Sequence, residues 1–126
     1  MPALSNYHAA TLLNASLRSG TYYLGLFLSE PGAANTGVEV TGGGYSRKQI
    51  TFTAPTLVSG KEQVSNNADI DYGAVTADLG TIAYWGIYDA ASNGNLLWYG
   101  PFVRARNILT GDAITVKSGA IVCQLS

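Results

Sequence analysis

A polar turn at Asn93-Gly94 joins two β-rich runs within residues 81–100, and no other stretch of the chain constrains its fold as strongly. A two-residue type I′ turn needs a positive φ at both central positions, and Asn followed by Gly is the pair that adopts it most readily. The sequence therefore predicts an antiparallel hairpin at this position.

Alternation along the first run of this hairpin places Tyr84, Gly86 and Tyr88 on one face of the strand, since successive side chains point to opposite sides. The other face carries Ala83, Trp85 and Ile87. One of the two faces is expected to be buried. We interpret the tyrosine face as a subunit interface, with a core position and contact with a glycan as the alternatives.

The rest of the chain after Gly20 also resembles a series of strands divided by Gly, Pro and Asn. Residues 21–28 are apolar on both faces, which is typical of a central strand covered from both sides. Residues 61–67 are polar and indicate a turn. The other expected strands are residues 38–40 and 45–52, paired as a hairpin around Gly42–Gly44, and residues 68–72, 113–117 and 120–125. The fold class is thus mainly β, an antiparallel sandwich (jelly-roll or immunoglobulin-like) of about seven or eight strands.

One α-helix is predicted near the N-terminus, over residues 3–18, with Ser5 as its N-cap and Gly20 as its stop. The apolar residues at spacings of three and four are Leu4, Tyr7, Ala10, Leu13 and Leu17. An isolated helix of this length is marginal in water. We therefore expect residues 1–20 to pack on their own or on a neighbouring subunit, and residues 21–126 to form the sandwich domain.

Charge is scarce in this chain: seven basic and eight acidic residues make up 12% of it, with a net charge of −1. This excludes the basic surface that nucleic acid or an anionic membrane requires, and no stretch is long and apolar enough to cross a membrane. Little self-repulsion favours oligomers. Cys123, the only cysteine, cannot form an intrachain disulfide and is expected to be a buried apolar side chain.

No residue is assigned a catalytic, metal-binding or cofactor-binding role, and an enzyme is not expected. His8 has no nucleophile or acid near it in the pattern. Gly42–Gly44 lacks the lysine and the helix start of a phosphate loop. Asp69 and Asp71 point to one face and are the best candidates for a hard cation, but a complete calcium loop is missing, so solvated acids are the preferred interpretation.

Arg104 and Arg106 alternate along a predicted strand and share a face, where they are hypothesised to pair with acids across a subunit boundary. The residues predicted to form interfaces between subunits are Leu4, Tyr7, Leu13, Leu17, Tyr84, Tyr88, Arg104 and Arg106.

Several short motifs, in their order along nearly the whole chain, resemble small tail-fibre-like or head-fibre-like structural proteins of tailed bacteriophages. They are residues 4–7 opening the helix, residues 23–27 followed by Glu30-Pro31, residues 39–47, residues 85–90 with 94–97, and residues 110–112 before the last two strands. The resemblance implies a virion component made in the host cytoplasm, often trimeric, placed on capsid, collar or tail. Its partners would be copies of itself, other virion proteins and, as an alternative function, a host surface receptor or glycan.

Overall fold

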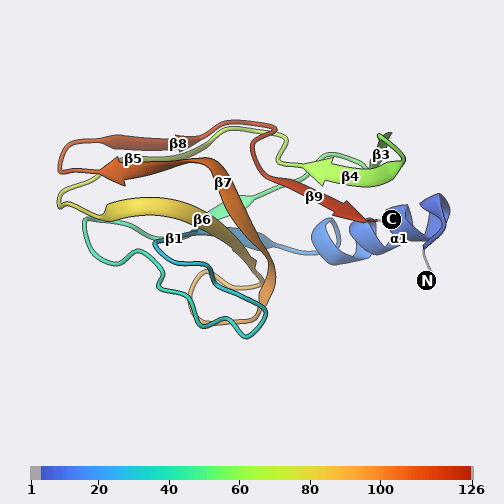
Figure 1. Cartoon of the computed structure of the whole chain (residues 1–126), viewed down its shortest axis with the longest axis horizontal. Coiled ribbons are helices and arrows are strands. Elements are labelled where there is room, and N and C mark those ends of the chain that lie inside the picture. Colours follow the sequence, from blue (N-terminus) through green and yellow to red (C-terminus); the bar gives the residue numbers. More distant parts are fainter. Residues whose placement is uncertain (1–3, 126) are drawn as a thin grey trace.

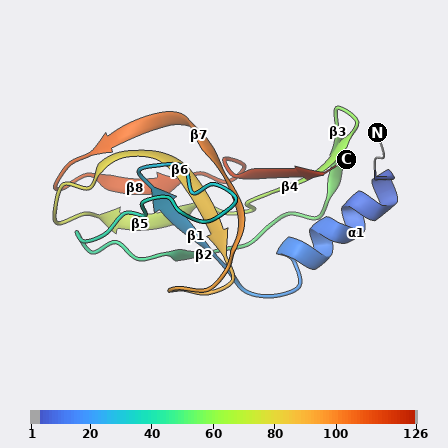
Figure 2. The ribbon, with the colours of Figure 1, turned by 60° about the horizontal axis from the view of Figure 1, so that its bottom comes forward.

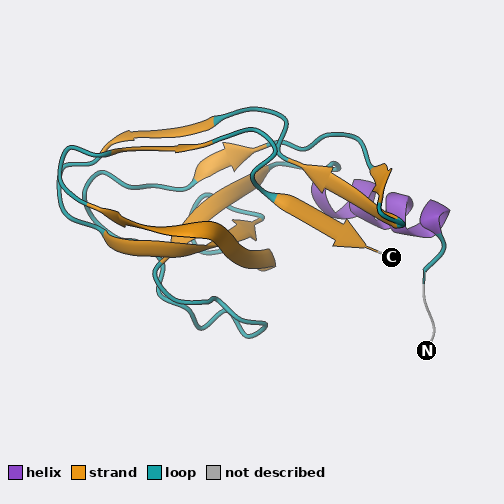
Figure 3. Cartoon of the chain, turned by 45° about the horizontal axis from the view of Figure 1, so that its top comes forward, coloured by secondary structure: helices purple, strands orange, loops and turns teal. Residues whose placement is uncertain are grey.

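A computed structural model describes residues 4–125 and shows one helix followed by nine strands within that range (Figures 1 and 3). The elements are α1 (Asn6–Leu17), β1 (Tyr22–Phe27), β2 (Lys48–Ile50), β3 (Thr56–Val58), β4 (Lys61–Ser65), β5 (Ile70–Ala74), β6 (Gly80–Tyr88), β7 (Leu96–Ile108), β8 (Ala113–Val116) and β9 (Val122–Leu125). Every pairing between these strands is antiparallel. The predicted class, mainly β with an N-terminal helix, is confirmed.

The largest sheet has the strand order β2-β1-β6-β7, and β1 lies inside it as the apolar pattern predicted. Every residue of β1 except Tyr23 is buried. Its partners run along both edges, with Tyr22 opposite Ile50 of β2 and Phe27 opposite Tyr84 of β6. A strand with neighbours on both sides and packing on both faces has no place for a polar side chain.

The hairpin predicted around Gly42–Gly44 does not form, because both of its arms pair with β1 instead. Glu39 bridges Phe27, and the amide of Val40 donates to the carbonyl of Leu26 at 2.9 Å. Farther along the same edge, β2 pairs with the start of β1. Both segments thus pair with the same edge of β1, and residues 41–47 form the loop that connects them.

Residues 61–67 were expected to form a turn, and this prediction is wrong. Residues 61–65 form β4, the middle strand of a sheet with the order β3-β4-β9. The tight turn lies just before it, at Ser59 and Gly60, which both have positive φ. The polar side chains of β4 misled the prediction, because only Val64 is fully buried while Gln63 pairs opposite Gln124 on the solvent side.

The pair β5-β8 forms a further layer that packs on the four-stranded sheet (Figure 2). The buried core contains aliphatic side chains from both, such as Leu26 and Ile87 of the large sheet and Ile114 and Val116 of β8. The hydroxyl of Tyr72 donates to the carbonyl of Leu24 at 2.7 Å and joins the layers by a polar contact.

The helix packs on β4 and β9 of its own chain, and both termini lie at this end of the molecule (Figure 1). Ser5 caps it as predicted, accepting from the amide of His8 at 3.2 Å. The helix begins at Asn6, and Ala3, which the prediction included, lies outside the described residues. The buried residues are Ala9, Leu13 and Leu17, so the apolar stripe is rotated away from Tyr7, which is 81% exposed.

Candidate functional site

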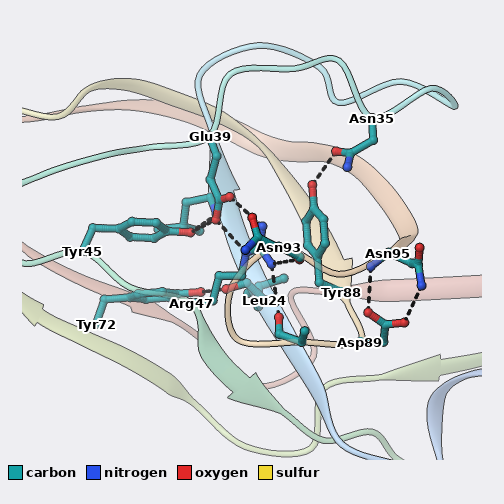
Figure 4. A network of polar contacts seen from close by, with 12 residues as sticks. Leu24, Asn35, Glu39, Tyr45, Arg47, Tyr72, Tyr88, Asp89, Asn93 and Asn95 are labelled. Carbon is teal, nitrogen blue, oxygen red and sulfur yellow. Dashed lines mark hydrogen bonds and ion pairs between the residues drawn. The ribbon is translucent and has the colours of Figure 1, made fainter.

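The polar centre of the molecule is Arg47, in the loop that leads into β2 (Figure 4). Its Nε and Nη2 donate to the two carboxylate oxygens of Glu39 at 2.9 and 2.8 Å, while Nη1 donates to the carbonyls of Ala90 and Asn93 at 3.1 and 2.7 Å. The guanidinium also lies 3.6 Å from the ring centroid of Tyr88. One side chain therefore joins the strand segment at Glu39 to the β6–β7 loop.

The carboxylate of Glu39 stabilises the charged guanidinium of Arg47. Burial pushes the pKa of Arg47 down, but the hydrogen bonds and charge of Glu39 outweigh that effect, so the pKa lies above its ordinary value. The side chain of Arg47 is 9% exposed and that of Glu39 is 23% exposed. The pair is a largely desolvated, two-pronged contact of the kind that fixes geometry as well as charge.

The β6–β7 loop that Arg47 holds is the hairpin that the sequence predicted. Asn93 and Gly94 both have positive φ, at 56° and 76°, as a type I′ turn requires. The connection is longer than two residues, however, since the last paired residues are Tyr88 and Leu96. Asp89 closes it by accepting from the backbone amide and the side chain of Asn95 at 2.7 and 3.0 Å, and these bonds lower the pKa of Asp89.

Aromatic rings lie beside this network and contact one another in pairs. Tyr45 stacks on Tyr72 with ring centroids 5.8 Å apart, and Phe27 stacks on Tyr88 at 6.2 Å. The guanidinium of Arg47 also lies over the ring of Tyr88. Burial raises the pKa values of Tyr45, Tyr72 and Tyr88, so all three hydroxyls stay protonated and act as donors.

Between these loops lies an open hollow of about 660 Å³. Neutral polar groups of Thr41, Ser46, Ser92 and Asn93 lie around the paired charges of Glu39 and Arg47. Its volume falls in the range of small-molecule sites. The walls offer hydrogen bonds to a neutral polar ligand. They offer neither a nucleophile with a base nor a free charge.

The structure separates the residues predicted to form subunit interfaces into buried and exposed ones. Leu13, Leu17 and Tyr88 are at most 2% exposed within their own chain, so these side chains are already packed internally, and their interface role stays a prediction. Leu4 and Tyr84 are half-buried. Tyr7, Arg104 and Arg106 are exposed.

Arg104 and Arg106 lie on β7, the end strand of the large sheet. Both line one narrow slot of about 140 Å³ between β7 and β8, which confirms that they share a face. Neither forms an ion pair with any residue in the range 4–125. Their predicted pairing across a subunit boundary therefore stays a prediction.

The other candidate site residues are Cys123, Asp69 and Asp71. Cys123 is 1% exposed, and burial raises the pKa of its thiol to about 12. Asp69 and Asp71 are exposed, and within residues 4–125 no three His, Cys, Asp or Glu side chains gather as metal ligands would. No helix in the described part of the chain is long and apolar enough to cross a membrane.

A protein-family comparison now places the chain. Residues 3–124 match the family described as podophage GP4 fiber I protein gp80. The chain belongs to this family. It is thus a phage fibre structural protein and a virion component, as the order of its motifs indicated. No curated protein matches the sequence.

Within this fibre protein, the network around Arg47 is what sequence reasoning missed. From the sequence alone, residues 39–47 were only one of the motifs of the family resemblance, and neither Arg47 nor Glu39 was given a role. The available signal was an acid and a base flanking the three glycines at 42–44 in a chain with few charges. Its partner carbonyls in residues 90–93 follow no sequence pattern, because any backbone can supply them.

Proposed function

We propose that this fibre protein works through assembly, as a homotrimer that also contacts other virion proteins. The observation that carries the proposal is the free edge of β7. This 13-residue strand pairs with β6 on one side, and within residues 4–125 no strand pairs with its other side. A long edge presents unpaired backbone donors and acceptors that recruit another chain unless they are covered.

The side chains along β7 support this interpretation. Val103 is 99% exposed, and Leu97 and Tyr99 are 39% and 38% exposed. Val122 of β9, which lines the same groove as Tyr99 and Val103, is 38% exposed. Apolar surface of this kind, gathered along one strand edge, is typical of protein–protein contacts.

The outward face of α1 gives a second, smaller surface. The sequence of the helix, Asn6–Leu17, contains no Asp, Glu, Lys or Arg, although one side faces solvent. Tyr7 and Leu12 are 81% and 37% exposed there. A surface helix normally carries charge on its outer side. We assign Leu4 and Tyr7 to contacts with a neighbouring virion protein or copy, and Tyr84 keeps its proposed interface role through its half-exposed surface.

The location within the virion follows as part of the same proposal: a tail fibre, a head fibre or decoration protein, or a collar component. The site geometry supports a structural role over an enzymatic one, because the charges around Arg47 are consumed by internal contacts. A net charge of −1 supports partners other than nucleic acid.

Deleting the gene from a phage that encodes this chain tests the proposal. Negative-stain images of purified particles are expected to lack one set of fibres, and complementation should restore it. An antibody against the chain should label intact wild-type particles. Particles with a full set of fibres and no label would contradict the structural role.

A second function, binding of a host surface glycan, is favoured by the open polar hollow beside Arg47. Sugars are usually recognised by hydrogen bonds together with an aromatic platform, yet Tyr88 is only 2% exposed and already contacts Arg47 and Phe27. Recognition there would depend on hydrogen bonds alone. A glycan array with the purified protein tests it: specific binding that Ser92→Trp removes would support this function, and an array without hits would remove it.

A further inference from the structure

We propose that Arg104 and Arg106 of one copy pair with Asp69 and Asp71 of a second copy of this chain. The inference rests on the proposed assembly function and names the surfaces that meet. Each copy carries both patches, the arginines on β7 and the aspartates at the start of β5. The proposed contact joins the basic patch of one copy to the acidic patch of another.

The basic patch lies on a part of β7 whose pairing with β6 is irregular. In the register of β6 with β7, Ile82 pairs with Arg106 and Tyr84 with Pro101, so four residues of β7 lie opposite one residue of β6. The extra residues form a β-bulge that contains Val103, whose side chain is 99% exposed. Bulges of this kind redirect side chains at sheet edges. Arg104 and Arg106 lie on the face of β7 that borders the slot toward β8, and both are exposed to solvent.

Nothing in the described chain neutralises these two arginines. The ion pairs of residues 4–125 are Arg47–Glu39 and Lys117–Asp69. The slot that Arg104 and Arg106 line has apolar walls, including Ile114 and Val116 of β8. Two like charges beside an apolar slot repel each other, and an anionic partner would relieve that repulsion.

The acidic patch lies at the start of β5. Asp69 and Asp71 flank Ile70, which is 6% exposed, so both carboxylates point to the solvent side. One oxygen of each is held by its own chain, since Asp69 accepts from the amide of Ser118 and Asp71 from the amide of Gly73, both at 2.8 Å. Within residues 4–125 the second oxygen of Asp71 has no hydrogen-bond partner, and that of Asp69 contacts only Lys117. The 3.6 Å contact of Asp69 with Lys117 joins two exposed side chains and is weak.

The two patches match in spacing. Arg104 and Arg106 are the only basic residues two positions apart in the sequence, and Asp69 and Asp71 are the only acidic ones. Residues two apart in extended backbone are at most about 6–7 Å apart, and this limit applies to both pairs. Two pairs of opposite sign with one spacing can bond in register, and the match identifies a second copy as the partner because one sequence supplies both halves.

The contact also has a consequence for symmetry. The β7 side of one copy would meet the β5 side of the next, so the two surfaces are different. Contacts of this head-to-tail kind close into rings when the rotation per copy divides a full turn. The proposed pairing is thus compatible with a trimer, and it would place the exposed Val103 beside the contact.

Charge reversal tests the pairing directly. The double variant Arg104→Glu/Arg106→Glu is expected to weaken self-association by about tenfold or more, measured by sedimentation velocity over a concentration series. Asp69→Lys/Asp71→Lys should do the same. The quadruple variant with all four changes should assemble again, because it restores opposite charges. Arg104→Lys/Arg106→Lys keeps the charge and serves as the matched control.

The outcomes separate this inference from the proposed function. A wild-type protein that stays monomeric would contradict the assembly function itself. A wild-type oligomer that is unchanged by Arg104→Glu/Arg106→Glu would overturn the pairing and leave assembly in place. Circular dichroism reports whether each variant folds. Lower unfolding stability with unchanged association would assign the arginines to contacts within one chain and also overturn the inference.

Discussion

The guanidinium carbon of Arg47 lies over the ring of Tyr88, 3.6 Å from the ring centroid. The two residues come from different segments, the loop before β2 and the end of β6. Because Glu39 and two loop carbonyls bind the same guanidinium, this contact fixes the loops at one side of the large sheet. Stacking of a cation on an aromatic ring adds to these hydrogen bonds when both are shielded from water.

Replacing Arg47 by Ala is expected to lower the free energy of unfolding by about 2 kcal/mol, because it leaves the partly buried carboxylate of Glu39 without its partner. Urea denaturation measures the change. Lys61→Ala, which removes an exposed base that forms no ion pair within residues 4–125, is the control and should change stability by less than about 0.5 kcal/mol. Equal effects of the two would contradict the role given to Arg47.

Leu13 and Tyr7 test whether the helix packs on its own chain. Leu13→Ala should destabilise the protein by about 2–5 kcal/mol, since it opens a cavity under α1, whereas Tyr7→Ala should have little effect on unfolding. Thermal denaturation at several protein concentrations is the measurement. If the loss caused by Leu13→Ala vanished at low concentration, the helix would be packing on a neighbour instead.

Gly94 is expected to reject a side chain for two reasons. Its φ is +76°, and a Cβ there would lie 2.6 Å from Oδ1 of Asp89. Gly94→Ala should therefore destabilise by about 1–3 kcal/mol. Gly111→Ala has a similarly positive φ and no atom within 4 Å, so it isolates the backbone contribution. Indistinguishable denaturation midpoints for the two would show that the contact with Asp89 does not matter.

Acid should weaken the fold through aspartates in turns. Backbone hydrogen bonds lower the pKa values of Asp78 and Asp89 below the ordinary value of 3.8. Groups with a lowered folded pKa stabilise the fold above their unfolded pKa, and this contribution is lost as the pH falls through the folded value. Asp78→Asn/Asp89→Asn should thus lose less stability than the wild type between pH 6 and pH 2 in urea titrations. The same loss in both proteins would contradict this assignment.

The sequence predicted those parts of the fold that depend on local signals. The cap at Ser5, the buried β1 and the positive φ values of Asn93 and Gly94 each follow from residues close together in the chain. In each case the types of a few neighbouring residues favour one local structure. The order of the motifs also led to the correct family, because local turn and strand signals follow one another along the chain as they do in that family.

Long-range partners were not predictable in the same way. The segment around Glu39 had a plausible partner next to it in residues 45–52, yet it pairs with β1, and nothing local records that choice. The polar pattern of β4 conceals a strand because one face is open to solvent. The spacing of Leu13 and Leu17 showed that one face of the helix must be buried. It did not show whether the same chain or a neighbouring subunit buries that face. Such choices depend on which apolar edges and faces meet after the chain collapses.

The mass of the purified protein in solution tests the central claim, that this fibre protein acts through assembly, most directly. Multi-angle light scattering during size-exclusion chromatography, over a hundredfold range of concentration, gives that mass without assumptions about shape. Since one chain has a mass of 13.2 kDa, a trimer is expected to give about three times this value. A mass of one chain at every concentration would contradict it.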